Sequence, residues 1–276
     1  MPLTVSVVIP ARNDAEMLAR CLAALAAQTR PADEIVVVDN GSTDDTRAVA
    51  EAAGARVVWE PVAGIPRAAS AGYDAATGDL IARIDADTVC PPEWIAHAVE
   101  VFEAEPGLDA ISGDAEFYGG SARLDRRARR IWIGGMYWSM TGWLGHAPVF
   151  GSNFVMRRAM WREISGEVHR ELRRIHDDLD LSLHVKPWMT VRRDRELFVA
   201  ISARPFATIR GTARRVSWVV PTLAMHLPED VPWRRRAARK AWARALDRRT
   251  AVARGLEGYG AIDGYDDDEG VAPAAS

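Results

Sequence analysis

Short apolar runs alternate with stretches of helical periodicity over the first hundred residues of the chain. Four of these runs are rich in β-branched residues and have the length of buried parallel strands: residues 5–10, 34–39, 56–60 and 79–85. Between them, residues 15–28 carry leucines at helical spacing, and residues 42–54 open with Ser42 or Thr43 as a candidate cap and end at Gly54. Strands and helices that alternate with short links predict βαβ units, and therefore an α/β fold with a mostly parallel, Rossmann-like sheet flanked by helices.

The pattern changes after residue 90. A helix is expected to begin near Pro92, and residues 108–117 resemble one more strand. Residues 131–150 carry no charge apart from His146, and their length alone would allow a membrane-spanning helix. Four glycines, a proline and a basic flank favour an interfacial or buried helix instead. Aromatic side chains in the stretch agree with this interpretation: Trp132, Tyr137, Trp138 and Trp143.

Charge is distributed unevenly along the chain, although the net value is only −3 at pH 7. Residues 1–121 hold 7 Lys and Arg against 20 Asp and Glu, whereas residues 122–254 hold 28 against 12. The acidic half can host a cation. The basic half, which includes a helix-prone stretch over residues 232–249, suits an anionic partner such as a phosphate, a lipid headgroup or a nucleic acid. Simple solvation of basic helices would explain the same excess. Residues 255–276 are acidic and rich in small residues, which predicts a disordered tail.

Length and cysteine content limit the class of protein. A chain of 276 residues with 48% hydrophobic residues can form one large α/β domain or two small ones. Cys21 and Cys90 form neither a C-x-x-C motif nor part of a metal-ligand cluster, so we expect reduced thiols in a cytoplasmic protein. Residues 1–10 enter an apolar strand pattern without a basic segment, which predicts that there is no signal peptide.

Polar residues follow three of the predicted strands. These strands end in "PARND", "DNGS" and "DADT", and parallel sheets bind ligands beyond the carboxyl ends of their strands. In "DADT", strand alternation would direct Asp85 and Asp87 to the same side, and paired carboxylates are ligands for Mg²⁺ or Mn²⁺. Asp39 can accept hydrogen bonds from a base or a ribose, with Arg12 and Asp14 in reach of the same ligand. The sequence therefore predicts a binding edge that carries a metal site.

Five motifs extend this picture in order along the chain: "VVIPARND", "VVVDNGSTDDT", "GDLIARIDADTVCPPEW", "GSNFVMRR" and "HDDLDLSL". Their order and spacing resemble the family 2 glycosyltransferases of GT-A fold. The resemblance implies a single GT-A domain in which residues 1–121 bind the donor and residues 122–254 shape the acceptor side. It also implies a metal-dependent, inverting transfer of a sugar from a UDP- or GDP-sugar to an acceptor hydroxyl, with Mg²⁺ or Mn²⁺ as the cofactor.

The resemblance assigns roles to individual residues. Nucleotide binding is implied for Pro10, Ala11, Arg12, Asp14, Asp39 and Asp85, with Arg67 as a candidate replacement for an arginine that the family often carries nearby. Asp87 would be the more direct metal ligand, together with Asp85. The donor and acceptor sugars would lie beside Gly151, Ser152 and Asn153. Asp178 would be the catalytic base, with Asp177 next in line.

Other interpretations of the same residues remain open. "RIDADTV" also fits a haloacid dehalogenase-type phosphatase, although that strand usually opens its fold and residues 1–78 precede it here. A non-catalytic protein of glycosyltransferase-like fold could bind an anionic polymer through residues 122–254. Processive synthases are disfavoured because Q-x-x-R-W is absent, and dinucleotide oxidoreductases because G-x-G-x-x-G is absent. His226 is a candidate late metal ligand, and an ordinary histidine is the simpler reading.

The basic, tryptophan-rich half also bears on the acceptor. Five arginines in residues 123–130 directly precede the uncharged aromatic stretch. Basic residues and aromatic rings together bind anionic membrane surfaces. We therefore expect a lipid-linked acceptor and peripheral contact with the inner face of the membrane, with a phosphorylated soluble acceptor as the alternative and no nucleic acid as a partner.

Overall fold

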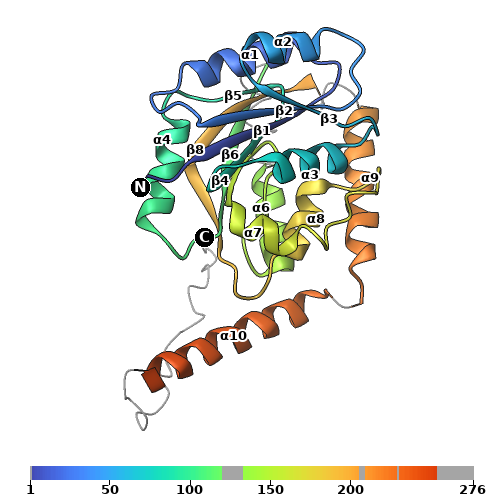
Figure 1. Cartoon of the computed structure of the whole chain (residues 1–276). Coiled ribbons are helices and arrows are strands. Elements are labelled where there is room, and N and C mark those ends of the chain that lie inside the picture. Colours follow the sequence, from blue (N-terminus) through green and yellow to red (C-terminus); the bar gives the residue numbers. More distant parts are fainter. Residues whose placement is uncertain (1, 120–132, 205–208, 229, 254–276) are drawn as a thin grey trace, which may run out of the picture.

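One eight-stranded sheet forms the centre of the molecule, which a computed structural model describes over residues 2–119, 133–204, 209–228 and 230–253. The strands lie in the order β3-β2-β1-β4-β7-β6-β8-β5 (Figure 1). Their bounds are β1 (Val5–Ala11), β2 (Glu34–Asp39), β3 (Arg56–Trp59), β4 (Leu80–Ile84), β5 (Thr88–Val89), β6 (Ala110–Tyr118), β7 (Asn153–Arg157) and β8 (Val191–Ser202).

The sheet is mixed but mostly parallel. Strands β1 to β4 run parallel to one another, and β6 runs parallel to β8. Strand β7 is antiparallel to both β4 and β6, and the short β5 is antiparallel to β8. The predicted α/β class with a mostly parallel sheet is therefore confirmed.

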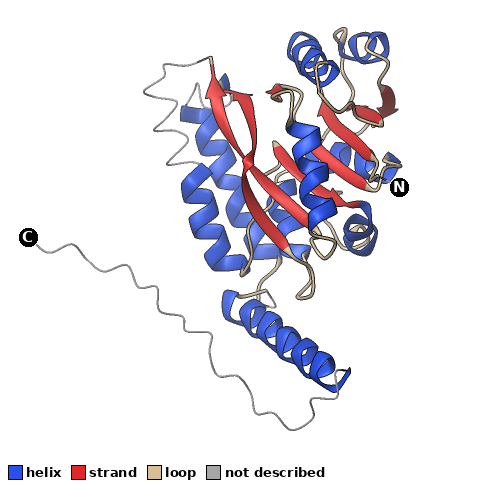
Figure 2. Cartoon of the chain, turned by 90° about the vertical axis from the view of Figure 1, so that its left-hand side faces the viewer, coloured by secondary structure: helices blue, strands red, loops and turns tan. Residues whose placement is uncertain are grey.

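Helices cover both faces of the sheet (Figures 1 and 2). One face packs against α1 and α4, and the other against α3, α7 and α8. The helices are α1 (Ala15–Ala26), α2 (Thr46–Ala52), α3 (Ile65–Ala75), α4 (Trp94–Ala104), α6 (Gly135–Leu144), α7 (Arg158–Ile164), α8 (Asp177–His184), α9 (Ile209–Met225) and α10 (Pro232–Ala253). Helix α9 contacts α8, and α10 contacts α6 while its far end extends away from the sheet (Figure 1).

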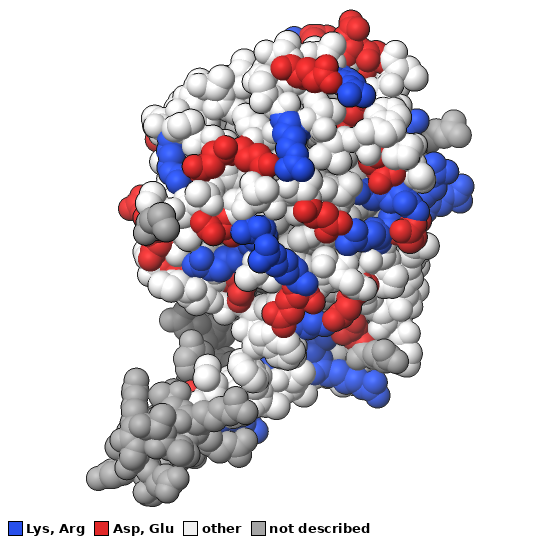
Figure 3. Space-filling model, in the orientation of Figure 1, with Lys and Arg blue, Asp and Glu red and all other residues white. Residues whose placement is uncertain are grey.

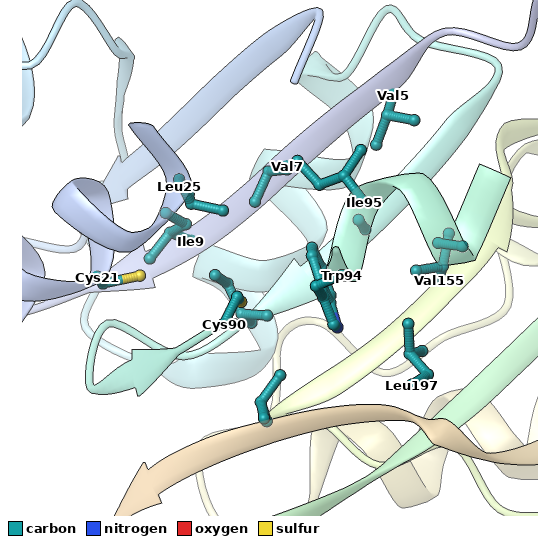
Figure 4. Close-up of a cluster of buried hydrophobic side chains, with 14 of the residues drawn as sticks. Val5, Val7, Ile9, Cys21, Leu25, Cys90, Trp94, Ile95, Val155 and Leu197 are labelled. Carbon is teal, nitrogen blue, oxygen red and sulfur yellow. The ribbon is translucent and has the colours of Figure 1, made fainter. Parts of the chain in front are cut away.

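Alternation along β1 divides the core between the two faces. Val5, Val7 and Ile9 belong to the cluster under α1 and α4, whereas Val8 belongs to the cluster under α3. Figure 4 shows the first cluster around the fully buried Trp94. Burial of each such side chain contributes about 1.5–3 kcal/mol. Cys21 and Cys90, which also belong to this cluster, are both free.

Two predicted boundaries at the binding edge are wrong. Strand β4 ends at Ile84, so Asp85 and Asp87 lie in the following turn and strand alternation does not direct them. Helix α2 begins at Thr46 because the Asp44 carboxylate accepts the Thr46 N–H at 3.1 Å. Ser42 and Thr43, expected as caps, instead bond to the loop after β1 through Asn13.

The uncharged stretch 131–150 contains a helix of ten residues, α6, which is much shorter than the stretch. Tyr137 is buried and donates to the Gly113 carbonyl at 2.8 Å, whereas Trp138 is 83% exposed. Trp132 lies outside the described residues. Among the helices that the structure describes, none combines the length and apolarity that crossing a membrane requires.

The antiparallel strand β7 and the long β8 were not expected from the sequence. Strand β7 falls within "GSNFVMRR", and β8, "VRRDRELFVAIS", has five consecutive charged residues followed by an apolar run. The predicted basic helix over 232–249 is confirmed as α10. The acidic tail 255–276 lies outside the described residues.

Candidate active site

The carboxyl ends of β1, β2 and β4 bring the three polar strand ends together, as predicted. Pro10 and Ala11 end β1, and Ala11 is the register partner of Asp39, which ends β2. Strand β4 pairs with the other side of β1 and leads directly into Asp85. Arg12 follows β1 and is exposed at the rim of this edge.

The end of β2 organises the loop between β3 and α3. Asp39 is 1% exposed, and its Oδ1 accepts a backbone N–H from the turn that follows. The Asn40 Nδ2 donates to the carbonyls of Glu60 and Val62 at 2.9 and 2.8 Å, and its Oδ1 accepts the Gly64 N–H at 2.7 Å. Asn40 was not singled out from the sequence, because an asparagine followed by glycine is typical of any tight turn.

Asp85 is held by the protein on both carboxylate oxygens. Its Oδ2 accepts the Ser152 hydroxyl at 2.6 Å, and its Oδ1 lies 3.0 Å from Arg83 Nη2. The turn is closed by the Thr88 N–H, which donates to the Asp85 carbonyl at 3.0 Å. These contacts fix Asp85 and direct the turn that carries Asp87.

Asp87 lies in a crowded acidic environment. Burial, and then the neighbouring Asp85 carboxylate, raise the pKa of Asp87 to about 6. Arg204, just after β8, opposes this shift: its Nη2 lies 3.5 Å from Asp87 Oδ2 and 2.9 Å from Asp14 Oδ1. Arg204 was missed from the sequence because a single arginine in "SARPF" belongs to no recognisable pattern.

The D-x-D turn fits a divalent cation. Its donors are carboxylate oxygens, the ligands that Mg²⁺ and Mn²⁺ prefer. Burial, and then the neighbouring Asp85 carboxylate, raise the pKa of Asp87, and a bound cation would favour its ionised form. Asp87 and Asp85 are therefore the residues that would hold the metal.

The N-terminus of α8 presents two further acids. Asp178 Oδ2 accepts the Gly151 N–H at 3.0 Å, and its Oδ1 accepts the Leu179 N–H at 2.8 Å. Asp177 Oδ2 lies 3.4 Å from Arg83 Nη1. Burial raises the pKa of Asp177 to about 6, despite the opposing attraction of Arg83.

Arg83 connects the D-x-D turn to α8. Its side chain is only 4% exposed, and its guanidinium lies between Asp85 and Asp177. Burial opposes its charge, but Asp177 and Asp85 hold the pKa of Arg83 above its usual range. The sequence contained a signal that we did not use: an arginine inside the apolar run "LIARID" needs buried acidic partners.

The turn before β7 also connects the D-x-D turn to the start of α8. A Cβ at Gly151 would lie 2.1 Å from Arg83 Nη1 and 3.0 Å from Asp178 Oδ2, so only glycine fits without displacement. Ser152 holds Asp85, as described above. Gly151 and Ser152 are thus adjacent to the acids, and their expected place beside a sugar stays a prediction.

The structure places the side chain of Asn153, which was expected beside a sugar, inside the core. Its side chain is fully buried, and its Nδ2 donates to the carbonyls of Asp114 and Leu197 at 2.8 and 2.7 Å. Its Oδ1 accepts the indole N–H of Trp94 at 2.9 Å. Both polar atoms of the amide have partners inside the core, and through them Asn153 positions the turn.

Arg67 and His226 both have acidic partners outside the D-x-D turn. Arg67, on α3, forms an ion pair with Glu171 in the segment before α8. The two ring nitrogens of His226 face Asp180 and Asp230, at 3.1 and 3.2 Å. His226 therefore does not join the D-x-D turn.

This sheet with its acidic edge defines the GT-A class of fold, and solved structures agree. The mannosyltransferase PcManGT from Pyrobaculum calidifontis, solved with GDP-Man and Mn²⁺, superposes with a TM-score of 0.68 at 19% identity, covering 94% of this chain and 77% of that one. Glucosyl-3-phosphoglycerate synthase from Mycobacterium tuberculosis, solved with Mn²⁺, UDP and phosphoglyceric acid, gives 0.58 at 21% identity, covering 81% and 78%.

Sequence relatives define the family. The family model for glycosyl transferase family 2 matches residues 6–165, and the chain belongs to this family. Glycosyltransferase AglE of Haloferax volcanii is 32% identical over 121 residues, covering 41% of this chain and 40% of that protein. The undecaprenyl-phosphate 4-deoxy-4-formamido-L-arabinose transferase of Sodalis glossinidius is 41% identical over 107 residues, covering 35% and 33%. The matches span less than half the length of these relatives.

Proposed function

We propose that the protein transfers a sugar from a nucleoside-diphosphate sugar to an acceptor, with inversion at the anomeric carbon and with a divalent cation. The observation that carries the proposal is Arg83. This buried guanidinium lies 3.0 Å from Asp85 of the D-x-D turn and 3.4 Å from Asp177 at the start of α8. It joins the donor side and the acceptor side of one site.

On the donor side, Asp87 and Asp85 hold the cation, and the nucleoside lies along the ends of β1 and β2. When bound, the cation would neutralise charge on the departing nucleoside diphosphate. Arg204 adds a second positive charge within 3.5 Å of Asp87 and is placed to contact a phosphate. Asp39, which is 1% exposed at the end of β2, is the proposed partner of the ribose or base. Both UDP and GDP remain candidates, because the solved structures named above contain one each.

On the acceptor side, Asp178 is the proposed base. Backbone N–H groups of Gly151 and Leu179 hold its two oxygens and orient the carboxylate, and His176 Nδ1 lies 3.9 Å from Asp178 Oδ1. It would take the proton of the acceptor hydroxyl as that oxygen attacks the anomeric carbon from the side opposite the leaving diphosphate. Asp177 remains the second candidate.

The acceptor is proposed to be lipid-linked. Relatives that are 36–41% identical over part of the chain are named as undecaprenyl-phosphate transferases. The described residues also expose apolar side chains on the C-terminal half, among them Trp138, Val220 and Trp233 at 83%, 69% and 69%. On the face shown in Figure 3, basic and acidic groups are intermixed, and the described residues of this face show no continuous basic patch. The proposed contact therefore needs the exposed apolar side chains in addition to charge.

A hydroxyl acceptor needs a base such as Asp178, whereas a phosphate acceptor does not. A hydroxyl must lose a proton during attack, whereas a lipid phosphate is already ionised near neutral pH. The Asp178→Asn variant should therefore lose 10²–10⁴-fold in kcat with a hydroxyl acceptor, within the usual range for a general base, and far less with a phosphate acceptor.

The test begins with a donor screen. Hydrolysis of UDP- and GDP-sugars with Mn²⁺ identifies the donor, and transfer to undecaprenyl phosphate and to soluble sugars then identifies the acceptor class. The anomeric configuration of the product reports inversion. An enzyme that turns over equally well with EDTA, or that retains configuration, would contradict the proposal.

A further inference from the structure

A second group of metal-ligand side chains lies around α8 and shares no residue with the D-x-D turn. One ligand atom each of His169, Asp180, His184 and His226 lies within 4.8 Å of the others. The three imidazole rings surround the carboxylate, with ring centroids 4.9–5.4 Å apart. The residues come from the segment before α8, from α8 itself and from the position after α9.

The ligand atoms of His169, Asp180 and His226 have nearly the spacing that tetrahedral coordination of a metal ion needs. His169 Nδ1 lies 2.8 Å and His226 Nε2 lies 3.1 Å from the same oxygen, Asp180 Oδ1. In a tetrahedral zinc site with bonds of 2.0–2.1 Å, adjacent ligand atoms are about 3.3 Å apart. An opening of a few tenths of an ångström would admit an ion among these three atoms.

Outer contacts orient the ligands as they do in metal sites. The His226 Nδ1 lies 3.2 Å from Asp230 Oδ2, and Asp230 is itself held by Arg235 at 2.8 Å. A carboxylate on the far nitrogen of a histidine is a common feature of zinc sites. The His184 Nδ1 lies 2.8 Å from the Asp180 carbonyl, so its N–H is used there and Nε2 is the acceptor nitrogen. The Asp180 Oδ2 accepts the backbone N–H of His169 at 2.8 Å.

We propose that Asp180, His169, His226 and His184 form a structural zinc-type site. Three imidazole nitrogens and one carboxylate oxygen favour Zn²⁺ or Co²⁺ over Mg²⁺, which prefers oxygen ligands. The site would tie α8, whose first residues are Asp177 and Asp178, to the end of α9. It is separate in residues and in metal preference from the D-x-D turn, and it does not depend on the proposed transfer reaction.

An ion can reach the cluster from solvent. The His169 side chain is 37% exposed. On another side, His184 and Asp230 line a cavity of about 340 Å³. The ligands therefore need not unfold for the metal to enter.

The experiment measures Zn²⁺ and Co²⁺ binding to the full chain, purified in EDTA and then dialysed, with excess Mg²⁺ present to occupy the D-x-D turn. We expect one Zn²⁺ per chain by calorimetry, a higher melting temperature with Zn²⁺, and the strong visible absorption of tetrahedral Co²⁺. The His169→Gln and His226→Gln variants should bind at least tenfold more weakly, and Asp230→Asn about 10–100-fold more weakly.

Two controls make the result specific. His97→Gln removes a histidine that pairs with Asp194 at 3.3 Å outside the cluster, and it should bind Zn²⁺ as the wild type does. Asp87→Ala removes the D-x-D ligand and should also keep this site. Circular dichroism confirms that each variant is folded, and His169→Gln, at the most exposed ligand, is expected to fold best. The proposal fails if the wild type binds no Zn²⁺ in excess Mg²⁺, if binding survives unchanged in His169→Gln, or if Asp87→Ala abolishes it.

Discussion

Replacement of Arg83 by methionine tests whether the buried cation holds the two acidic groups together. The change keeps an unbranched side chain of similar length in β4 but removes the charge between Asp85 and Asp177. Both acids would then lose a positive neighbour, and Asp177 lies in a buried position. We expect a large loss of stability and an even larger loss of turnover.

The magnitude follows from the burial of the pair. Removing one partner of a buried ion pair typically costs about 3–5 kcal/mol, because the other charge stays buried without compensation. Because the free energy of unfolding of a typical domain is about 5–15 kcal/mol, this loss would remove a large part of it. Neutralising the stranded acid should recover part of it, so Arg83→Met/Asp177→Asn should be more stable than Arg83→Met by at least about 1 kcal/mol.

Urea unfolding at pH 7.5, followed by circular dichroism, measures the free energies of the two single variants and the double variant. Arg47→Met is the matched control, because Arg47 forms an exposed helical pair with Glu51 and should resemble the wild type. If Arg83→Met unfolds at the same urea concentration as Arg47→Met, or if Asp177→Asn gives no recovery, the account of Arg83 as the link between the two sides is wrong.

Three further changes probe other parts of the site. Asp87→Ala should abolish Mn²⁺-dependent nucleotide binding in calorimetry while leaving the melting curve nearly unchanged, and unchanged binding would exclude it as a ligand. Gly151→Ala should lower kcat at least tenfold with a smaller effect on donor KM, since its Cβ would lie 2.1 Å from Arg83 Nη1; wild-type kcat would show that the turn can move freely. The pKa of Asp177 is about 6 in the folded protein, against an ordinary value of 3.8. Ionisation of Asp177 therefore lowers the free energy of unfolding of the wild type as the pH rises from about 4 through 6. Because Asp177→Asn cannot ionise, its free energy of unfolding should rise relative to that of the wild type by roughly 1–3 kcal/mol between pH 4 and pH 7.5. A constant difference across that range in urea unfolding would refute this assignment.

The parallel half of the fold was predictable because its signals are local. Strands β1 to β4 are short apolar runs separated by periodic helices, and the polar residues after them fall at one edge by the rules of parallel sheets. Strands β7 and β8 were missed for the opposite reason. Strand β7 has only five residues and pairs antiparallel, and β8 carries Arg192, Arg193 and Arg195 within a pattern that the sequence alone does not distinguish from a loop.

The site was predictable to the extent that a residue's role follows from a motif. The motifs singled out Asp85 and Asp178, and the structure places them beside Ser152 and Gly151. Arg204 could not be found, because its proximity to Asp14 depends on a contact between residues 190 positions apart. Asn153 shows the converse problem: a motif residue can serve the core, and only its buried partners reveal this.

The turn at Gly151, Ser152 and Asn153 has a consequence for how this protein can vary. Its three consecutive residues face three different places: Asp178 on α8, the D-x-D turn and the interior. A substitution at one position disturbs one of these connections, but an insertion or deletion would shift all three by a residue at once. Sequence variation in this chain should therefore accumulate in loop length elsewhere, while the spacing between donor and acceptor groups stays fixed by this tripeptide.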